Sequence, residues 1–354
     1  MARYAQYLRE RKLRELAMAG EPPPTESYVR AVILKALDER SGEHGDWTVE
    51  GPLAKGRDSW IFKARTPLAK WPLAVKVYCA SKPADLVAKS YRDLQRYHLS
   101  MAGGRDTVPA PWAVLPEHRT HISEWIDYPV MGTLLSQAGR RREERAALLA
   151  AAGQWLGCFH RQAGISFGPL DHGQLQWHVD RSLGGTAGAW HAVGDGMFRH
   201  GYTTLVKHAE TFADTPVGHT TCHGDFTPTN LFLGPDRTVG FDFGAMNGRP
   251  VTFDICRFVM RAEANKPFAT RKADLSPQGL ERRDQEAFMA SYGPLERPLE
   301  GPILSYLCLA EALRRWATLI EERRGSRFSV THWVRLSRLR RMVGYAARHL
   351  EQTG

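Results

Sequence analysis

The chain has few cysteines and no long apolar run, and these two absences exclude several classes of protein. Five cysteines are scattered over 354 residues without a CxxC pair, so neither a disulfide scaffold nor a zinc ribbon is expected. No apolar stretch approaches the roughly 20 residues that a membrane-spanning helix needs. The N-terminal residues also lack the continuous hydrophobic stretch of a secretory signal. We therefore predict a globular protein of the reducing cytoplasm.

Acidic residues are outnumbered, but no nucleic-acid-binding module accompanies the basic excess. The formal net charge is +10, and residues 301–354 hold ten arginines against four glutamates. A basic balance brings nucleic acid, an anionic membrane surface or an anionic substrate into consideration. The basic residues do not interleave with aromatic residues in a recognisable binding module. Nucleic acid is therefore not expected as a partner, and a membrane surface is the less favoured alternative.

Changes of periodicity divide the chain into three segments. Residues 1–46 are predicted to be a helical extension, with helices at 3–19 and 26–40 around a proline run. Residues 47–126 contain short runs typical of antiparallel strands, one helix at 84–100, and two last strands at 110–116 and 120–126. Residues 127–354 show helical periodicity at 143–163, 250–265, 278–292, 300–322 and 330–351. These patterns predict an α+β protein with a small antiparallel-sheet half and a larger, mainly helical half.

The residues that indicate chemistry lie close together in one stretch of the sequence. The tripeptide His223-Gly224-Asp225 is followed by Asn230 and, after a predicted β-hairpin, by Asp242. A carboxylate and an amide oxygen are hard ligands of the kind that hold Mg²⁺ together with substrate phosphates. The remaining carboxylate is suited to accept a proton from an incoming hydroxyl group. The tripeptide alone would be a weak indication of catalysis, but its combination with Asn230 and Asp242 at these spacings is much more specific.

This stretch resembles the catalytic core of the aminoglycoside phosphotransferase and choline kinase family, which are small-molecule kinases with a two-lobed, protein-kinase-like fold. The resemblance implies that Asp225 is the catalytic base and that His223 supports the catalytic loop. It implies that Asn230 and Asp242 bind Mg²⁺, which bridges the phosphates of ATP. Asp254 resembles the structural aspartate that the family has at the start of a helix, where a carboxylate accepts backbone N–H bonds.

The first half of the chain carries the same resemblance in its nucleotide-binding residues. Lys76, in the run LAVKVY, resembles the strand lysine that contacts the α- and β-phosphates. The loop containing Gly56 and Ser59 would cover the phosphates. Glu124 and Ile126 lie in a segment similar to the linker between the lobes, whose backbone would bind adenine.

Of two further family features, one is present in this sequence and the other is missing. The run LGCFHR at 156–161 resembles the helix that precedes the catalytic loop. The helix glutamate that usually pairs with the strand lysine is missing, since Ser90 stands at the expected position. Asp85 and Asp93 are the candidates out of register, so the partner of the lysine stays open.

The acceptor is predicted to be the hydroxyl group of a small molecule. Only nine residues separate Gly244 from Asp254, and no APE motif follows, so a peptide-binding platform has no room. The acceptor cleft is predicted to include Arg257, Arg261, Glu311 and Arg315. Their charge favours a neutral or anionic acceptor, such as a sugar, a metabolite or a glycolipid head group.

Several alternatives remain at this point. The arginines of the cleft could form ion pairs between helices instead of binding substrate. The chain could be an aminoglycoside-modifying kinase, or a kinase-like scaffold protein with weak or no catalysis.

The helix at 330–351 has an apolar face that includes Leu339 and Val343. That face could pack on the helical half, with arginines such as Arg338 in solvent, or lie on an anionic membrane.

Overall fold

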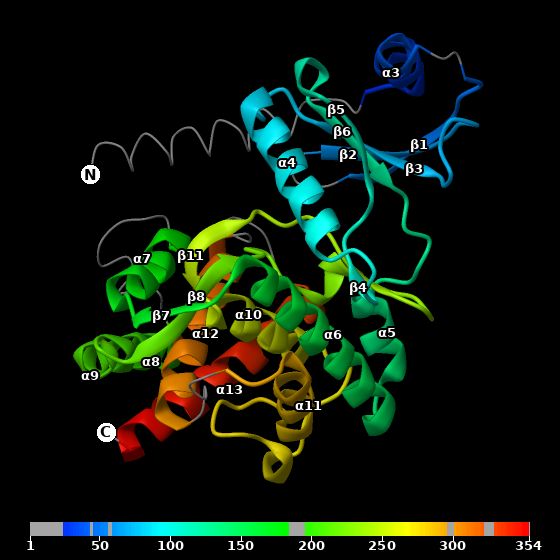
Figure 1. Cartoon of the computed structure of the whole chain (residues 1–354). Helices are drawn as coiled ribbons and strands as arrows, with labels where there is room; N and C mark the ends of the chain where they lie inside the picture. Colours follow the sequence, from blue (N-terminus) through cyan, green and yellow to red (C-terminus); the bar gives the residue numbers. More distant parts are fainter. Residues whose placement is uncertain are drawn as a thin grey trace. The chain divides into compact units, whose positions relative to one another are not determined.

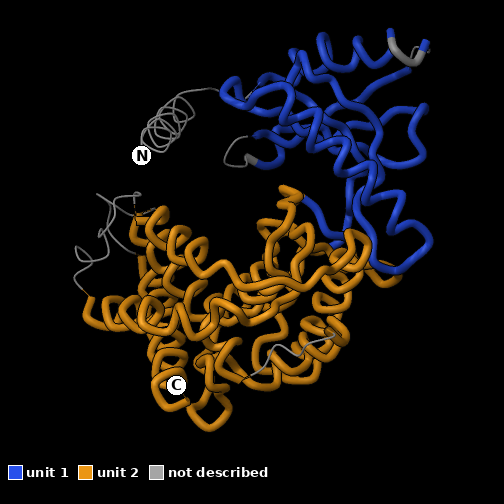
Figure 2. Tube along the Cα trace, turned by 60° about the vertical axis from the view of Figure 1, so that its left-hand side comes forward, with its two compact units in different colours: residues 1–128, 239–241 blue, residues 129–238, 242–354 orange. Residues whose placement is uncertain are grey.

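The computed structural model contains two compact units, which Figure 2 shows in different colours. Unit 1 comprises residues 1–128 and 239–241, and unit 2 comprises residues 129–238 and 242–354. The structure describes residues 24–42, 45–55, 59–183, 195–295, 301–321 and 329–353. The predicted helix at 3–19 and the predicted loop residue Gly56 lie outside the described residues.

Unit 1 is built on a five-stranded antiparallel sheet with the strand order β1-β2-β3-β6-β5 (Figure 1). Its strands are β1 (Thr48–Lys55), β2 (Ser59–Arg65), β3 (Leu73–Tyr78), β5 (Pro111–Leu115) and β6 (Thr120–Glu124). The shorter elements β4 (Asp106–Thr107) and a 3₁₀ turn, η2 (Pro116–His118), connect the later part. The predicted antiparallel meander is therefore confirmed for β1 to β3.

One face of this sheet is covered by the helical segment that precedes it. The segment consists of α2 (Glu26–Tyr28), the π-helical turn η1 (Val29–Leu34) and α3 (Lys35–Ser41). Alternation along β3 turns Leu73 and Val75 toward this segment, where they share one buried cluster with Ile33 and Leu37. The indole of Trp47 also donates a hydrogen bond of 2.8 Å to Asp38.

The other face of the sheet carries Lys76 and is packed by the long helix α4 (Ala84–Ser100). Tyr91 of α4 contacts His121 of β6, with 6.5 Å between the ring centroids. His121 lies opposite Lys76 in the register of β3 and β6. Because side chains alternate along a strand, the apolar core of unit 1 lies on one face of the sheet, and Lys76, the predicted phosphate-binding lysine, lies on the other.

Unit 2 is mainly helical. Its helices are α5 (Met131–Ala138), α6 (Arg142–Ala163), α7 (His172–Ser182), α8 (Gly196–Lys207), α9 (Ala209–Phe212), α10 (Thr252–Ala264), α11 (Arg282–Tyr292), α12 (Gly301–Glu321) and α13 (Val330–Thr353), with the 3₁₀ turns η4 (Pro228–Asn230) and η5 (Lys272–Asp274). A small antiparallel sheet contains β7 (Ser166–Pro169), β8 (Pro216–Cys222) and β11 (Met246–Pro250) in the order β11-β8-β7. The four long C-terminal helices lie where the sequence predicted them.

Helices α6 and α11 approach each other closely because two glycines of α6 face the contact. A Cβ atom added at Gly153 would lie 2.1 Å from the carbonyl oxygen of Phe288. One at Gly157 would lie 2.1 Å from the carbonyl oxygen of Tyr292. Neither distance is tolerated, so glycine at these positions is a packing requirement.

Helix α13 packs on α12 and α8 through the apolar face predicted from its sequence. Leu339 and Val343 are buried, whereas Trp333 at the start of the helix is 59% exposed. The prediction that Arg338 is solvated was wrong: its side chain is only 9% exposed and donates to the carbonyl oxygens of Ala264 and Phe268. The long apolar stem of arginine can be buried when carbonyl groups satisfy its donors.

We expect Leu339→Asp to lower the melting temperature by several degrees, because it buries a charge without a partner between α13 and α12. Calorimetry measures the change. Ser337→Asp is the matched control, since Ser337 is exposed on the same helix and the introduced side chain is identical. Equal melting temperatures for the two variants would contradict the buried position of Leu339.

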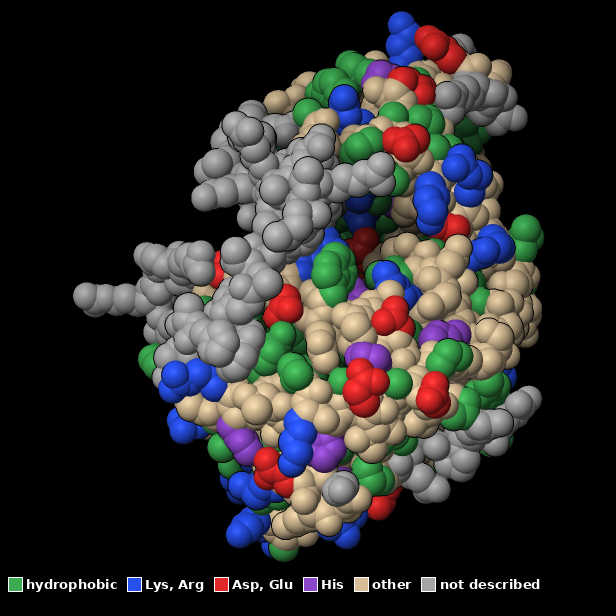
Figure 3. Space-filling model, turned by 90° about the vertical axis from the view of Figure 1, so that its left-hand side faces the viewer, with side chains coloured by type: hydrophobic (Ala, Val, Ile, Leu, Met, Phe, Trp, Pro, Cys, Tyr) green, Lys and Arg blue, Asp and Glu red, His purple; other side chains and the backbone are tan. Residues whose placement is uncertain are grey.

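None of the helices in the described part of the chain combines the length and the apolar character that crossing a bilayer requires. On the face drawn in Figure 3, basic and acidic side chains are interspersed. Interspersed charges of both signs give weaker long-range fields than a patch of one sign.

Candidate active site

The predicted catalytic loop follows β8, and its conformation is stabilised by residues of the loop itself. Gly224 has a φ of +87°, and a Cβ atom there would lie 3.0 Å from the side chain of Met246. The buried ring of His223 accepts a hydrogen bond of 3.3 Å from the Asp225 N–H through Nδ1. The Asp225 side chain itself is 59% exposed. The loop therefore presents one carboxylate to solvent from a buried support.

Asn230 holds the carboxylate of Asp225 from the other side. Its Nδ2 donates to the backbone oxygen of Asp225 at 2.9 Å and to Oδ2 at 3.3 Å. After Asn230 come β9 (Leu231–Leu233), a turn and β10 (Thr238–Gly240). Asp242 follows with a φ of +60°, a left-handed conformation that is uncommon outside glycine and asparagine and often marks a functional position.

Asp254 is fully buried at the start of α10, and its carboxylate supports the loop. It accepts hydrogen bonds from the backbone N–H groups of His223, at 2.5 Å, and Gly224, at 3.0 Å. The ring of His160 lies 3.1 Å from the same carboxylate. Burial alone would raise the pKa of Asp254, but the hydrogen bond from His160 contributes to holding that pKa below its ordinary value. Asp254 therefore stays ionised.

His160 is a support residue to which the sequence analysis assigned no role. Its Nδ1 lies 2.9 Å from the hydroxyl of Tyr292, so the tyrosine, His160 and Asp254 form one buried chain that ends at the catalytic loop. The run LGCFHR contains His160 and was the available signal. The contact itself joins residues 94 positions apart, which no local pattern predicts.

Arg257 connects the catalytic loop with α10 and α12. Its guanidinium donates to the backbone oxygen of Gly224 and lies 3.6 Å from Asp225 Oδ1. Its Nε lies 3.5 Å from Glu311, and the guanidinium stands over the ring of Phe253 at 4.3 Å. The structure thus places this predicted acceptor residue against the predicted base, where it also positions the loop.

Glu311 of α12 is buried and ionised. Arg314 donates to it twice, each time at 2.5 Å. Burial would raise the pKa of Glu311, but the charge and hydrogen bonds of Arg314, together with the charges of Arg257 and Arg261, lower it to about 2. The predicted acceptor residues Arg257 and Arg261 therefore act, together with Arg314, on the carboxylate of Glu311.

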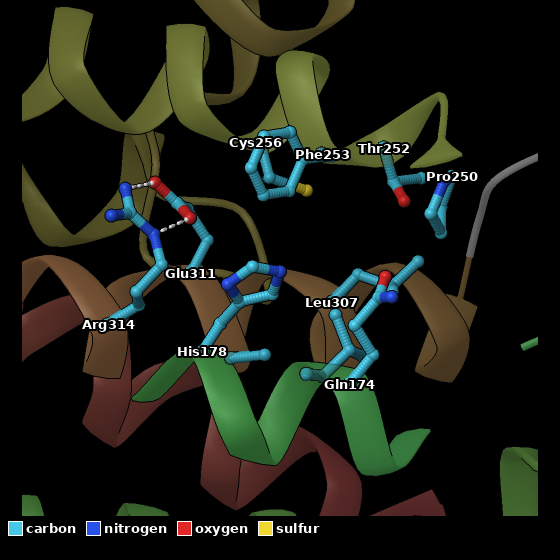
Figure 4. Close-up of a pocket in the computed structure, with 11 residues that line it drawn as sticks. Gln174, His178, Pro250, Thr252, Phe253, Cys256, Leu307, Glu311 and Arg314 are labelled. Carbon is cyan, nitrogen blue, oxygen red and sulfur yellow. Dashed lines mark hydrogen bonds and ion pairs between the residues drawn. The ribbon is translucent and has the colours of Figure 1, made fainter. Parts of the chain in front are cut away.

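A pocket opens beside these residues, between α7, α10 and α12 (Figure 4). Phe253, Leu307 and Glu311 line it, and His178 points into it from α7. The Nε2 atom of His178 is buried without a hydrogen-bond partner in the described structure. Burial, with the charges of Arg249 and other arginines, lowers the pKa of His178 to about 4, so its ring is neutral at pH 7. The sequence analysis did not single out α7.

The predicted nucleotide residues of unit 1 lie at the ends of strands and on one sheet face. Ser59 begins β2 and is buried. Lys76 Nζ stands 5.0 Å from the centroid of the Tyr78 ring. The carboxylate of Glu124 accepts the Ala110 N–H at 3.2 Å, and the Glu124 N–H donates to the Ala110 oxygen at 2.8 Å.

The segment after Glu124 and helix α4 complete this picture. Ile126 is buried. Of the two aspartates proposed as partners of the strand lysine, Asp93 accepts a hydrogen bond of 2.8 Å from Lys89, while Asp85 lies exposed in the first turn of α4. Neither observation assigns the partner of Lys76.

Comparison with known proteins places this site in context. Residues 64–287, more than half of the chain, match the model of a family described as the phosphotransferase enzyme family. Comparison with curated proteins gave no match.

Several solved structures share the fold at low sequence identity. A choline/ethanolamine kinase family protein from Mesorhizobium loti is 13% identical, with a TM-score of 0.53, and the match covers 97% of this chain and 99% of that one. A putative fructosamine-3-kinase from Thermobifida fusca is 15% identical, with a TM-score of 0.51 over 90% and 99%. An amicoumacin kinase in complex with AMP-PNP, Ca²⁺ and its ligand is 12% identical, with a TM-score of 0.55 over 93% and 97%. The two-lobed, protein-kinase-like α+β fold is thereby confirmed.

Proposed function

Because the chain belongs to the phosphotransferase enzyme family, we propose that it is a small-molecule kinase that transfers the γ-phosphoryl group of ATP, with Mg²⁺, to a hydroxyl group. One observation carries the proposal most directly. The exposed carboxylate of Asp225 is held by Asn230 and Arg257 on a loop whose support is entirely buried. A fixed carboxylate with access to solvent is what a general base for an incoming hydroxyl requires.

The proposed reaction assigns one proton transfer to this carboxylate. Asp225 would orient the acceptor hydroxyl and accept its proton while the new oxygen–phosphorus bond forms and ADP leaves. Arg257, 3.6 Å away, orients the carboxylate through its positive charge. Asn230, which donates to the same carboxylate, limits its rotation. Positioning of this kind supplies much of the catalysis in phosphoryl transfer.

The donor atoms available for a divalent cation fit Mg²⁺. The amide nitrogen of Asn230 is used in holding Asp225, which leaves its amide oxygen as a ligand, and Asp242 offers a carboxylate. Oxygen ligands of this type suit Mg²⁺, which is usually held by one or two side chains together with phosphate oxygens. When bound, the ion would neutralise charge on the transferred phosphoryl group. In unit 1, Lys76 would contact the α- and β-phosphates, with Ser59, Gly56 and the backbone near Glu124 and Ile126 completing the nucleotide site.

Charge supports a neutral or anionic acceptor over an aminoglycoside. The residues next to the proposed base on α10 and α12 include Arg257, Arg261, Arg314 and Arg315, whose charges act on one another. Against these four positive charges, α12 offers the carboxylate of Glu311, which Arg314 and Arg257 both contact. A polycation would be repelled by this arrangement.

We expect Asp242→Ala to abolish the Mg²⁺-dependent part of nucleotide binding, because it removes a charged ligand of the ion. Lys76→Ala should weaken Mg-ATP binding while its dependence on Mg²⁺ remains. Calorimetric titration of ATP with and without Mg²⁺ separates the two effects. Asp236→Ala and Lys70→Ala, at exposed positions, serve as controls. Wild-type affinity in both test variants would place the nucleotide elsewhere and favour a scaffold role.

A further inference from the structure

Part of the arginine charge beside the catalytic loop is neutralised within the protein. Arg314 of α12 is paired with Glu311 through two hydrogen bonds of 2.5 Å. Arg257 of α10 lies 3.5 Å from Glu311 and 3.6 Å from Asp225. Arg257 and Arg314, the first pair of arginines, therefore already interact with these two carboxylates.

The second pair of arginines consists of Arg261 on α10 and Arg315 on α12. Arg261 follows Arg257 by four residues on α10 and therefore shares its helix face, and Arg315 follows Glu311 by four residues on α12 and shares the face of that glutamate. The Nε atom of Arg261 is buried and has no hydrogen-bond partner among the described residues. A buried guanidinium donor without an acceptor costs free energy, so the protein alone does not complete this site.

The electrostatics of Arg261 agree with this geometry. Burial, followed by the positive charges of Arg315 and Arg314, lowers the pKa of Arg261 to about 9, although nearby carboxylates act in the opposite direction. The charged form is therefore held at a cost at neutral pH. A bound negative group would remove both the unmet donor and the excess of positive charge.

The position of this pair relates it to the acceptor. Asp225 is among the groups whose charges act on Arg261, and Arg257 links the Asp225 loop directly to α10. A small molecule whose hydroxyl lies at Asp225 is thus within electrostatic range of Arg261.

We propose that Arg261 and Arg315 form a subsite for an anionic group, a carboxylate or a phosphate, carried by the acceptor. The proposal rests on the proposed function, and it narrows the acceptor from neutral or anionic molecules to hydroxylated anions. Guanidinium groups bind both kinds of oxyanion through paired N–H donors. The same charges exclude polycations from the site.

The first test measures anion binding without any enzymatic turnover. Malonate and inorganic phosphate are titrated separately at constant ionic strength, and the melting temperature is followed by calorimetry. We expect at least one of them to stabilise the wild-type protein, and the stronger one identifies the carboxylate or phosphate class. In Arg261→Gln and Arg315→Gln, affinity should fall about 10- to 100-fold, since each loses a charge-assisted hydrogen bond. Arg348→Gln, at an exposed position of α13, should behave like the wild type.

The ligand-free proteins provide a second readout. Arg261→Gln should melt above the wild type, because it removes a positive charge whose buried Nε–H has no acceptor and which Arg314 and Arg315 repel. A lower melting temperature would mean that the protein itself already satisfies Arg261, and would overturn the proposal. The same conclusion follows if neither anion stabilises the wild type, or if both stabilise Arg261→Gln equally well.

A third test connects the subsite with the acceptor. Release of ADP is compared for glucose, glucuronate and glucose 6-phosphate, which share a hydroxylated ring and differ in charge. We expect kcat/KM for one anionic compound to exceed that for glucose by at least about tenfold, and Arg261→Gln to remove the difference. A preference for glucose would overturn the assignment. Absence of ATP turnover in the wild type, with anion binding as expected, would instead reject the proposed kinase function and leave the anion site.

Discussion

Asp225→Asn is expected to reduce phosphoryl transfer by about 10²- to 10⁴-fold, the largest effect on activity that the structure predicts. Asparagine keeps the size of the side chain and can still accept the hydrogen bond from Asn230, which is 3.3 Å long in the wild type. It cannot accept a proton from the acceptor hydroxyl, and it loses the charge that faces Arg257. Nucleotide affinity should stay within a few-fold, because the proposed metal ligands are unchanged.

The measurement is ADP release under saturating ATP, together with calorimetric binding of Mg-ATP. Because the Asp225 side chain is 59% exposed, the melting temperature should stay well above the assay temperature, so lost activity cannot be ascribed to unfolding. Asp214→Asn, at an exposed position in the turn before β8, makes the same chemical change away from the loop. Retention of most of the activity in Asp225→Asn would remove this residue from the role of base.

Lys266→Met is expected to produce the largest loss of stability, about 3–5 kcal/mol. The Lys266 ammonium is completely buried and lies 2.6 Å from Glu263, 2.5 Å from Glu281 and 2.8 Å from Asp284. These three carboxylates are close enough to hold a metal ion, and the lysine ammonium supplies the positive charge at their centre. Methionine has a similar length but leaves the carboxylates without it.

The pH dependence distinguishes this effect from a simple packing defect. Burial would raise the pKa of Glu263, but the charge of Lys266 contributes to lowering it below its ordinary value of 4.5. The stabilisation is therefore present above pH 4.5 and is lost as the pH falls below that value. The difference in melting temperature between Lys266→Met and the wild type should accordingly be large at pH 7 and shrink in acid. Lys272→Met, at an exposed site, is the control, and a difference independent of pH would contradict the ionic explanation.

The family could be predicted from the sequence alone and is confirmed. The candidate residues of the predicted catalytic loop were named from their spacing, and their roles stay predictions. The spacing of His223, Asp225, Asn230 and Asp242 is local, and the hydrogen bonds from Asn230 to Asp225 span five residues. Strands β1 to β3 and helices α10 to α13 were predicted because alternation and helical periodicity report which face of a single element is buried. Such patterns need no knowledge of what the buried face contacts.

The support of the loop and the burial of charged side chains depend on contacts between residues that are far apart in the sequence. His160 reaches Asp254 across 94 residues, Arg257 reaches Gly224 across 33, and Arg338 reaches Phe268 across 70. A charged side chain in a sequence pattern is expected to face solvent, since burying it is costly unless partners satisfy it. Those partners come from other helices, so their presence became visible only once the chain was folded.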